Sequence, residues 1–292
     1  MKSRLLIPLS LGIIGFVVLL TVVAHGGQFP LLDPAGTIGL LERDLMVRTV
    51  FLMLIVVIPV FILIIFVGWF YRAENTKAKY TPNWENSAME ELIWWSVPLE
   101  IVLVLAALTW SSTHELDPMR ALNHPKDPVV VEVVALPWKW LFIYPEQGIA
   151  SVNEVAFPAD APIEFHITAD APMNSFWIPA LGGQMYAMTG MSTSLHLIAP
   201  EPGDFAGRSA NYSGEGFSQM TFTARALEDD DFENWVKDAK ASGAALTPET
   251  YAVLAEPSDT GPVRYYGSVT MPFSAILNSF MSMPVMDHIE HH

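Results

Sequence analysis

Three long apolar segments dominate the first part of the chain. They cover residues 5–24, 45–71 and 92–110, and each is long enough to cross a bilayer, which takes about 20 mostly apolar residues as a helix. Residues 49–70 contain no charged side chain, whereas the third segment contains Glu100, a carboxylate that we expect to face protein or water. The pattern predicts a transmembrane helical hairpin within residues 26–112, with spans at about 45–71 and 92–111.

The first segment, residues 1–25, allows two interpretations. Lys2 and Arg4 precede an apolar stretch that ends at Ala24, which is typical of a secretory signal peptide. The same residues also suit a third, N-terminal span. A lipoprotein signal is excluded, because His25 stands where the acylated cysteine would be required.

The basic residues near the spans predict the orientation of the chain. Lys2 and Arg4 precede the first apolar segment, and Arg72, Lys77 and Lys79 follow the second. Because lysine and arginine accumulate on the cytoplasmic side of spans, both groups are expected in the cytoplasm and the large C-terminal part outside. Removal of residues 1–25 would not change this orientation.

Short β-branched and aromatic runs follow a proline-containing linker at residues 113–128. They predict about seven or eight strands within residues 129–226, arranged as an antiparallel sandwich or barrel. The C-terminal extension, residues 227–292, returns to helical patterns, and Thr247 is expected to cap a helix that has Pro248 in its first turn. The predicted strands include residues 129–134, 138–144, 163–168, 175–178, 194–198 and 220–224, and the predicted helices are residues 229–240, 247–254 and 272–280.

Composition supports a membrane protein and excludes one class of partner. The chain has 292 residues, 51% of them hydrophobic, and a mean hydropathy of +0.34. Its net charge is −16, and residues 113–292 alone hold 8 Lys and Arg against 23 Asp and Glu. Such an acidic surface repels nucleic acid, so no nucleic-acid partner is expected. The chain has no cysteine, so its stability outside the cell cannot depend on disulfides.

Five stretches, in this order and correctly spaced around the spans, carry a family resemblance. They are residues 31–36 (LLDPAG), 79–84 (KYTPNW), 138–148 (WKWLFIYPEQG), 173–179 (MNSFWIP) and 186–191 (YAMTGM). Together they resemble subunit II of the haem–copper terminal oxidases, in the ubiquinol oxidase branch of the cytochrome bo type. The resemblance runs from about residue 31 to residue 282. It implies a fold class of a membrane α-helical hairpin, with a third span or a signal peptide at its N-terminus, plus an all-β cupredoxin-like sandwich.

Residues 209–220 (SANYSGEGFSQM) match the spacing of the dinuclear copper loop of copper-bearing relatives, C-x-E-x-C-G-x-x-H-x-x-M. Both cysteines are serine here, the glutamate is asparagine and the histidine is phenylalanine. A hydroxyl is a poor substitute for a bridging thiolate, and the one remaining thioether cannot hold two copper ions. We therefore expect no metal site, cofactor-binding residue or catalytic residue in this chain. The degenerate copper-site positions are Asn174, which replaces a second histidine, and Ser209, Asn211, Ser213, Phe217 and Met220.

Two further features have a structural and a functional interpretation. Trp138, Trp140 and Tyr144 are expected on one strand; in cytochrome c oxidases such a cluster accepts electrons, but here we favour packing. The tail at residues 281–292 contains methionine and histidine, which could attract copper, although an exposed terminus is our preferred interpretation.

Glu91 is the candidate residue for proton uptake. It lies at the predicted cytoplasmic start of the last span, where by resemblance a glutamate stands at the mouth of a proton channel into the catalytic subunit. A carboxylate at the membrane interface can relay protons, but a negative charge is also favourable at any helix N-terminus. The adjacent Glu90 could be the true equivalent.

The resemblance implies subunit II of a proton-pumping ubiquinol oxidase of the aerobic respiratory chain, in which ubiquinol is oxidised and oxygen is reduced to water. Haems and copper are then expected in the partner subunit I, and the partners are subunit I, other oxidase subunits and membrane lipid. The implied location is the bacterial inner membrane, with the C-terminal domain in the periplasm. The alternative is a free-standing, membrane-anchored cupredoxin-like binding or assembly module. The haem types, and menaquinol in place of ubiquinol, stay open.

Overall fold

The chain divides into two compact units. The computed structural model describes residues 30–79, 81, 87–258 and 261–281, together with residues 12, 15, 17–19, 21 and 22. Residues 42–117 form one unit, the membrane unit, and the rest of the chain forms the other, the sandwich unit. The two interpretations of residues 1–25 fall largely outside the described residues, and the tail after Met281 falls outside them entirely.

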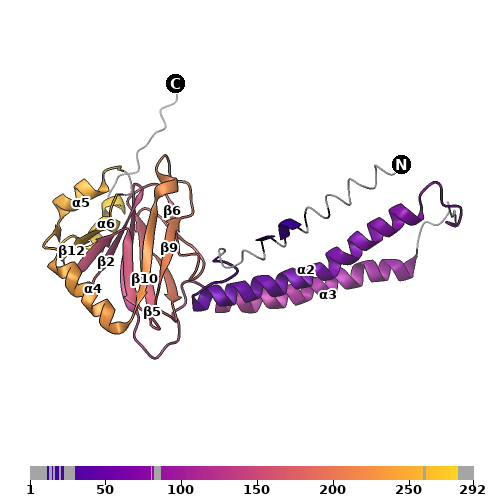
Figure 1. Ribbon diagram of the computed structural model, residues 1–292, viewed down its shortest axis with the longest axis horizontal. Helices are drawn as coiled ribbons and strands as arrows, with labels where there is room; N and C mark the ends of the chain where they lie inside the picture. The colour runs from indigo at the N-terminus through magenta and orange to yellow at the C-terminus, as the bar shows by residue number, and fades with distance from the viewer. Residues whose placement is uncertain are drawn as a thin grey trace, which may run out of the picture. The chain divides into compact units, whose positions relative to one another are not determined.

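The membrane unit contains most of one long helix and all of another, α2 (Thr37–Phe70) and α3 (Ala88–Glu115) (Figure 1). Both are long and apolar enough to cross a membrane, and their most apolar windows are 0% buried. They are therefore not core helices of a soluble protein, because side chains such as Ile65 and Trp95 would stand in water. This confirms the predicted pair of membrane-capable helices. Glu100 is exposed in the single chain, so its expected contact with protein or water stays a prediction.

The sandwich unit is built from two sheets that share one hydrophobic core (Figure 1). The strand order is β12-β3-β2-β1-β5-β8 in the six-stranded sheet and β4-β10-β9-β6-β7 in the five-stranded sheet. Val131 and Val133 of β1 and Phe222 of β10 point into the core between the sheets. The strands are β1 (Val129–Leu136), β2 (Lys139–Tyr144), β3 (Ile149–Val152), β4 (Glu154–Pro158), β5 (Pro162–Ala169), β6 (Asn174–Trp177), β7 (Met185–Ala187), β8 (Thr193–Ile198), β9 (Gly203–Ser209), β10 (Thr221–Leu227) and β12 (Arg264–Tyr266).

The sandwich differs from the prediction in two respects. β1 pairs with β5 and β4 pairs with β10 in parallel, so the expectation of a purely antiparallel sandwich was wrong. The parallel pairs arise because the chain crosses to the other sheet between β1 and β5, and such crossovers need a dozen or more residues. The strands β3, β4, β7, β9 and β12 were missed, because they are short or interrupted by small and polar residues, as in the sequence GDFAGRS of β9. The region from β1 to β10 therefore holds ten strands, and the expectation of seven or eight was wrong.

The C-terminal segments form a second hydrophobic core on the outer face of the six-stranded sheet. Leu141 and Ile143 of β2 pack there with Leu254 and Ile276. The hydroxyl of Thr247 caps α5 by accepting a hydrogen bond from the Thr250 amide, as predicted. The elements of this region are α4 (Asp229–Ala241), whose buried face joins the first core, and β11 (Ala245–Leu246), α5 (Pro248–Ala255), β13 (Ser268–Val269) and α6 (Phe273–Met281).

The first turn of α2 belongs to the sandwich unit and not to the membrane unit. The amides of Ala35 and Gly36 donate to the Ala180 carbonyl at 2.7 and 2.9 Å, and the Gly39 amide donates to the Leu181 carbonyl at 2.9 Å. Ala35 and Gly36 immediately precede the helix, and Gly39 lies in its first turn, where an amide has no acceptor inside the helix and would otherwise lack a partner. A Cβ atom at Gly36 would collide with the backbone of Leu181, so only glycine permits this approach.

Gly36→Ala is expected to lower the free energy of unfolding of the sandwich unit by about 1–3 kcal/mol, the usual cost of overpacking. The measurement is thermal unfolding of the detergent-solubilised chain. Gly68→Ala is the control, because Gly68 lies inside α2, the helix that Gly36 immediately precedes, and has no atom within 4 Å of its added Cβ. Equal stability of the two variants would contradict the close approach of Gly36 to the backbone of Leu181.

Candidate functional site

Two of the degenerate copper-site positions meet in a direct hydrogen bond. Asn174 begins β6 and Ser209 ends β9, and these strands pair in the five-stranded sheet. The Ser209 hydroxyl donates to Asn174 Oδ1 at 2.9 Å, and Asn174 Nδ2 donates to the Pro172 carbonyl at 2.7 Å. Both side chains are buried, so each polar atom needs such a partner.

The loop between Ser209 and Met220 is held by polar and aromatic contacts. Asn211 Nδ2 donates to the Met173 carbonyl at 2.9 Å. Phe217 lies in a short 3₁₀ helix, η2 (Phe217–Gln219), and its ring packs edge-on against Tyr212. Ser213 Oγ is a buried polar atom with no hydrogen-bond partner in the described part of the chain. The loop is therefore held by hydrogen bonds and ring packing at positions that match the spacing of a dinuclear copper loop.

Met220 is part of the core. Its side chain is 0% exposed and packs in the cluster between the two sheets. Its backbone carbonyl accepts a hydrogen bond from the Ser209 amide at 3.0 Å, which closes the loop. Within the described residues, no group of three His, Asp or Glu side chains is placed to hold a metal ion. Besides the ring of Phe217, the six positions offer two amides, two hydroxyls and one buried thioether, a set that suits neutral hydrogen bonding.

The prediction that the aromatic run lies on one strand was wrong. Trp138 lies in the turn between β1 and β2 with a positive φ of 59°, whereas Trp140 and Tyr144 are fully buried in β2. The Trp138 indole donates to the Ser213 carbonyl at 3.4 Å and lies directly against Gly216, where a Cβ would collide with its ring. Trp138 therefore supports the degenerate loop, because the turn takes its side chain off the strand.

A buried carboxylate that the sequence did not reveal joins three elements. Glu154 at the start of β4 accepts hydrogen bonds from Trp235 Nε1 at 2.9 Å and from the Tyr265 hydroxyl at 2.6 Å. Arg225 on β10 lies 3.8 Å from its other oxygen. Burial, followed by the hydrogen bond to Glu154, raises the pKa of Tyr265 to about 12. The phenol thus stays a donor, and Glu154 ties α4 and β12 to the sandwich.

Lys139 is a second buried charge that the sequence analysis gave no role. Its Nζ atom donates to the carbonyls of Leu254 and Glu256 at 2.8 and 2.9 Å and to Ser258 Oγ at 2.8 Å. Burial, and then the nearby Arg264, lower the pKa of Lys139. The ammonium directs two of its three donors to carbonyls at the C-terminal end of α5, which have no donor inside the helix, and the third to the Ser258 hydroxyl. A lone lysine inside the apolar run WKWLFIY was the available signal.

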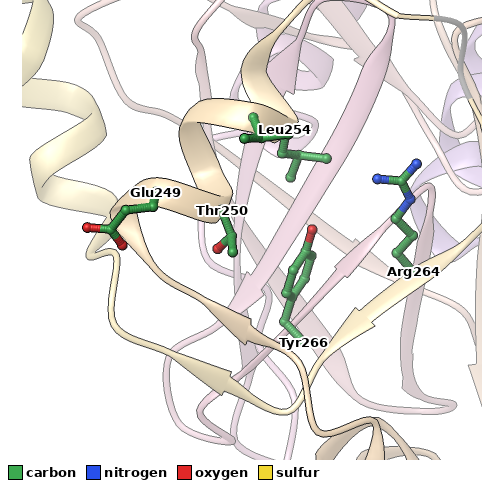
Figure 2. A pocket seen from close by; sticks show the side chains of 6 residues that line it. Glu249, Thr250, Leu254, Arg264 and Tyr266 are labelled. Carbon is green, nitrogen blue, oxygen red and sulfur yellow. The ribbon is translucent and has the colours of Figure 1, made fainter.

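An open pocket of about 360 Å³ lies beside this anchor. Glu249, Thr250 and Leu254 come from α5, and Arg264 and Tyr266 come from β12 (Figure 2). The pocket contains both an acid and a base, so its charges are balanced. Nothing in its lining distinguishes a particular ligand.

The proton-uptake candidates lie elsewhere, in the membrane unit. Glu90 and Glu91 both occupy the first turn of α3 and both are exposed. The Glu91 amide donates to the Ser87 carbonyl at 2.9 Å. Because the two carboxylates are adjacent at one helix end, their shared surroundings do not distinguish them.

Asn174→Ala is expected to lower the free energy of unfolding by about 1–3 kcal/mol, because it leaves the buried Ser209 hydroxyl without its acceptor. Denaturant unfolding of the full chain in detergent measures the loss. Ser218→Ala, at an exposed serine of η2, is the control and should change stability by less than about 0.5 kcal/mol. A loss no larger for Asn174→Ala than for the control would refute the proposed contact.

Comparison with known proteins identifies the family. The family model described as the COX Aromatic Rich Motif matches residues 240–283, the segment that contains α5, β12 and α6. Cytochrome bo(3) ubiquinol oxidase subunit 2 of Pseudomonas putida is 47% identical over 94% of this chain and 88% of its own. The protein of the same name from Pseudomonas aeruginosa is 51% identical over 84% and 74%, and ubiquinol oxidase subunit 2 of Acetobacter aceti is 46% identical over 98% and 93%.

Among solved structures, the periplasmic domain of subunit II of cytochrome oxidase from Bradyrhizobium japonicum is 25% identical, with a TM-score of 0.38 over 41% of this chain and 98% of that chain. The identities and coverages of the full-length relatives establish the family. The chain therefore belongs to the ubiquinol oxidase subunit 2 family, the branch of haem–copper oxidase subunits II that its sequence resembles.

Proposed function

We propose that this chain is a membrane-anchored subunit II that takes no part in electron transfer. The observation that carries the proposal is the hydrogen bond between Ser209 and Asn174, which occupies with neutral groups two positions where copper-bearing relatives have a thiolate and an imidazole. The absence of cysteine from the chain supports it, because a dinuclear copper centre depends on soft, charged bridging ligands. The haems and the copper of the complex then lie in the partner subunit I.

The quinol donor explains why a subunit without copper is sufficient. Quinol is dissolved in the bilayer and can deliver its electrons to subunit I within the membrane, so no external donor protein is needed. The role of this chain is to cover and brace subunit I. The basic residues Arg72, Lys77 and Lys79 between the two helices support a cytoplasmic loop, with the sandwich unit in the periplasm of an inner membrane.

The test is purification of the intact complex through a tag on this chain. We expect a haem-rich, copper-containing partner to co-purify, with ubiquinol-dependent oxygen uptake and no oxidation of reduced cytochrome c. After separation of the subunits, this chain should contain no copper. Copper in the separated chain would overturn the proposal. A chain without haem or partner would instead favour a free-standing module.

We also propose that Glu91 assists proton uptake into subunit I. The support is its place in the first turn of α3, exposed at the end of a span, where a carboxylate can collect and relay protons.

Glu91→Gln is expected to lower the rate of quinol oxidation by the complex about threefold or more, with little change in the KM for quinol, because only proton delivery is affected. Glu90→Gln is the matched control and should keep the wild-type rate. Steady-state oxygen uptake at saturating quinol gives the comparison. Loss of rate in the Glu90 variant alone would assign proton uptake to Glu90.

A further inference from the structure

Glu132 occupies an unusual position on the outer face of β1. Its neighbours Val131 and Val133 point into the core between the sheets, so the alternation of the strand places Glu132 on the opposite face. It lies in register with Ile143 of β2 and with His166 of β5. Near β2, this face is covered by α5 and α6, and Glu132 lies where that cover ends.

The carboxylate of Glu132 is partly buried without a partner. Among the described residues, none forms a hydrogen bond or an ion pair with it. Burial raises its pKa, which reflects the cost of removing a charge from water without compensation. Glu154, by contrast, has two hydrogen-bond donors and a nearby guanidinium.

Glu132 lines an open pocket of about 310 Å³ between the six-stranded sheet and α6, which we call the Glu132 pocket. Its walls are largely apolar and include Ile143, Pro145, Met271 and Phe273. No lysine or arginine is among the described residues that line it. The pocket thus combines apolar walls with one uncompensated carboxylate. The balanced pocket of Figure 2, in contrast, contains Arg264 as well as Glu249.

We propose that the Glu132 pocket receives a lysine side chain from a partner subunit of the oxidase. The four methylenes of lysine suit the apolar walls, and its ammonium supplies the charge that Glu132 lacks. Residues 282–292, which follow α6, contain no lysine or arginine that would match this chemistry. The net charge of −16 also favours docking of a basic surface. The inference rests on the proposed assembly with partner subunits.

The test is zero-length coupling in the purified complex, with a carbodiimide that joins a carboxylate to a lysine amine within contact distance. We expect a cross-linked peptide that contains Glu132 and a lysine of a partner subunit, identified by mass spectrometry. Glu132→Gln should abolish it. Glu164→Gln is the matched control and should keep it, because Glu164 lies on the same face but already contacts His166 Nε2 at 3.2 Å.

A second variant measures the strength of the contact. Glu132→Lys places two cations together and should reduce retention of the partner subunit at high salt about tenfold or more, whereas Glu164→Gln should not. A complex that co-purifies with full activity, gives no Glu132 cross-link and tolerates Glu132→Lys would overturn this inference and leave the proposed function intact. Failure of any partner to co-purify would instead be a failure of the proposed function.

Discussion

The middle of the six-stranded sheet, around β2, is buried on both of its faces, and the rest of the sandwich unit depends on this double burial. Alternate residues of β2 point to opposite sides: Trp140 and Phe142 fill the core between the sheets, while Leu141 and Ile143 fill the core under the C-terminal helices. Neither face of such a strand is exposed to solvent. The C-terminal segments are therefore part of the fold, because without them the outer face of the sheet would expose a large apolar surface.

Double burial also explains the hydrogen bonds of two buried charged side chains, those of Lys139 and Glu154. Lys139 lies at the start of β2 and is saturated by acceptors from the end of α5, and Glu154 is saturated by donors from α4 and β12. In both cases the partner comes from the C-terminal segments, so the charge ties the second layer to the first. Glu132 differs, because it lies where the second layer ends and no side chain of the described chain reaches it. An uncompensated charge at the edge of a layer is what an interface with another subunit can complete.

Local patterns predicted much of this fold, and tertiary contacts account for what they missed. Long β-branched runs such as β1 and β5 were found from the sequence, because their composition alone favours strands. The parallel pairing of these two strands was not predicted, because it depends on a crossover that no local pattern encodes. The family resemblance supplied the positions of Asn174 and Ser209, but only the structure shows that they bond to each other. Glu154 was missed for the same reason, because its donors lie 81 and 111 residues away in the chain.

The number of residues in the degenerate loop is constrained by contacts with the rest of the sandwich unit that involve no metal. Met220 packs in the core, and its carbonyl bonds to the Ser209 amide. Gly216 must remain glycine for Trp138 to lie against it. Changes in loop length would disturb all of these contacts, whereas replacement of a ligand by a small polar group disturbs none of them. The loop can keep its conformation without a metal because Asn174 and Ser209 bond to each other and to backbone carbonyls, so that Ser213 Oγ is the one buried polar side-chain atom at these positions without a partner in the described part of the chain.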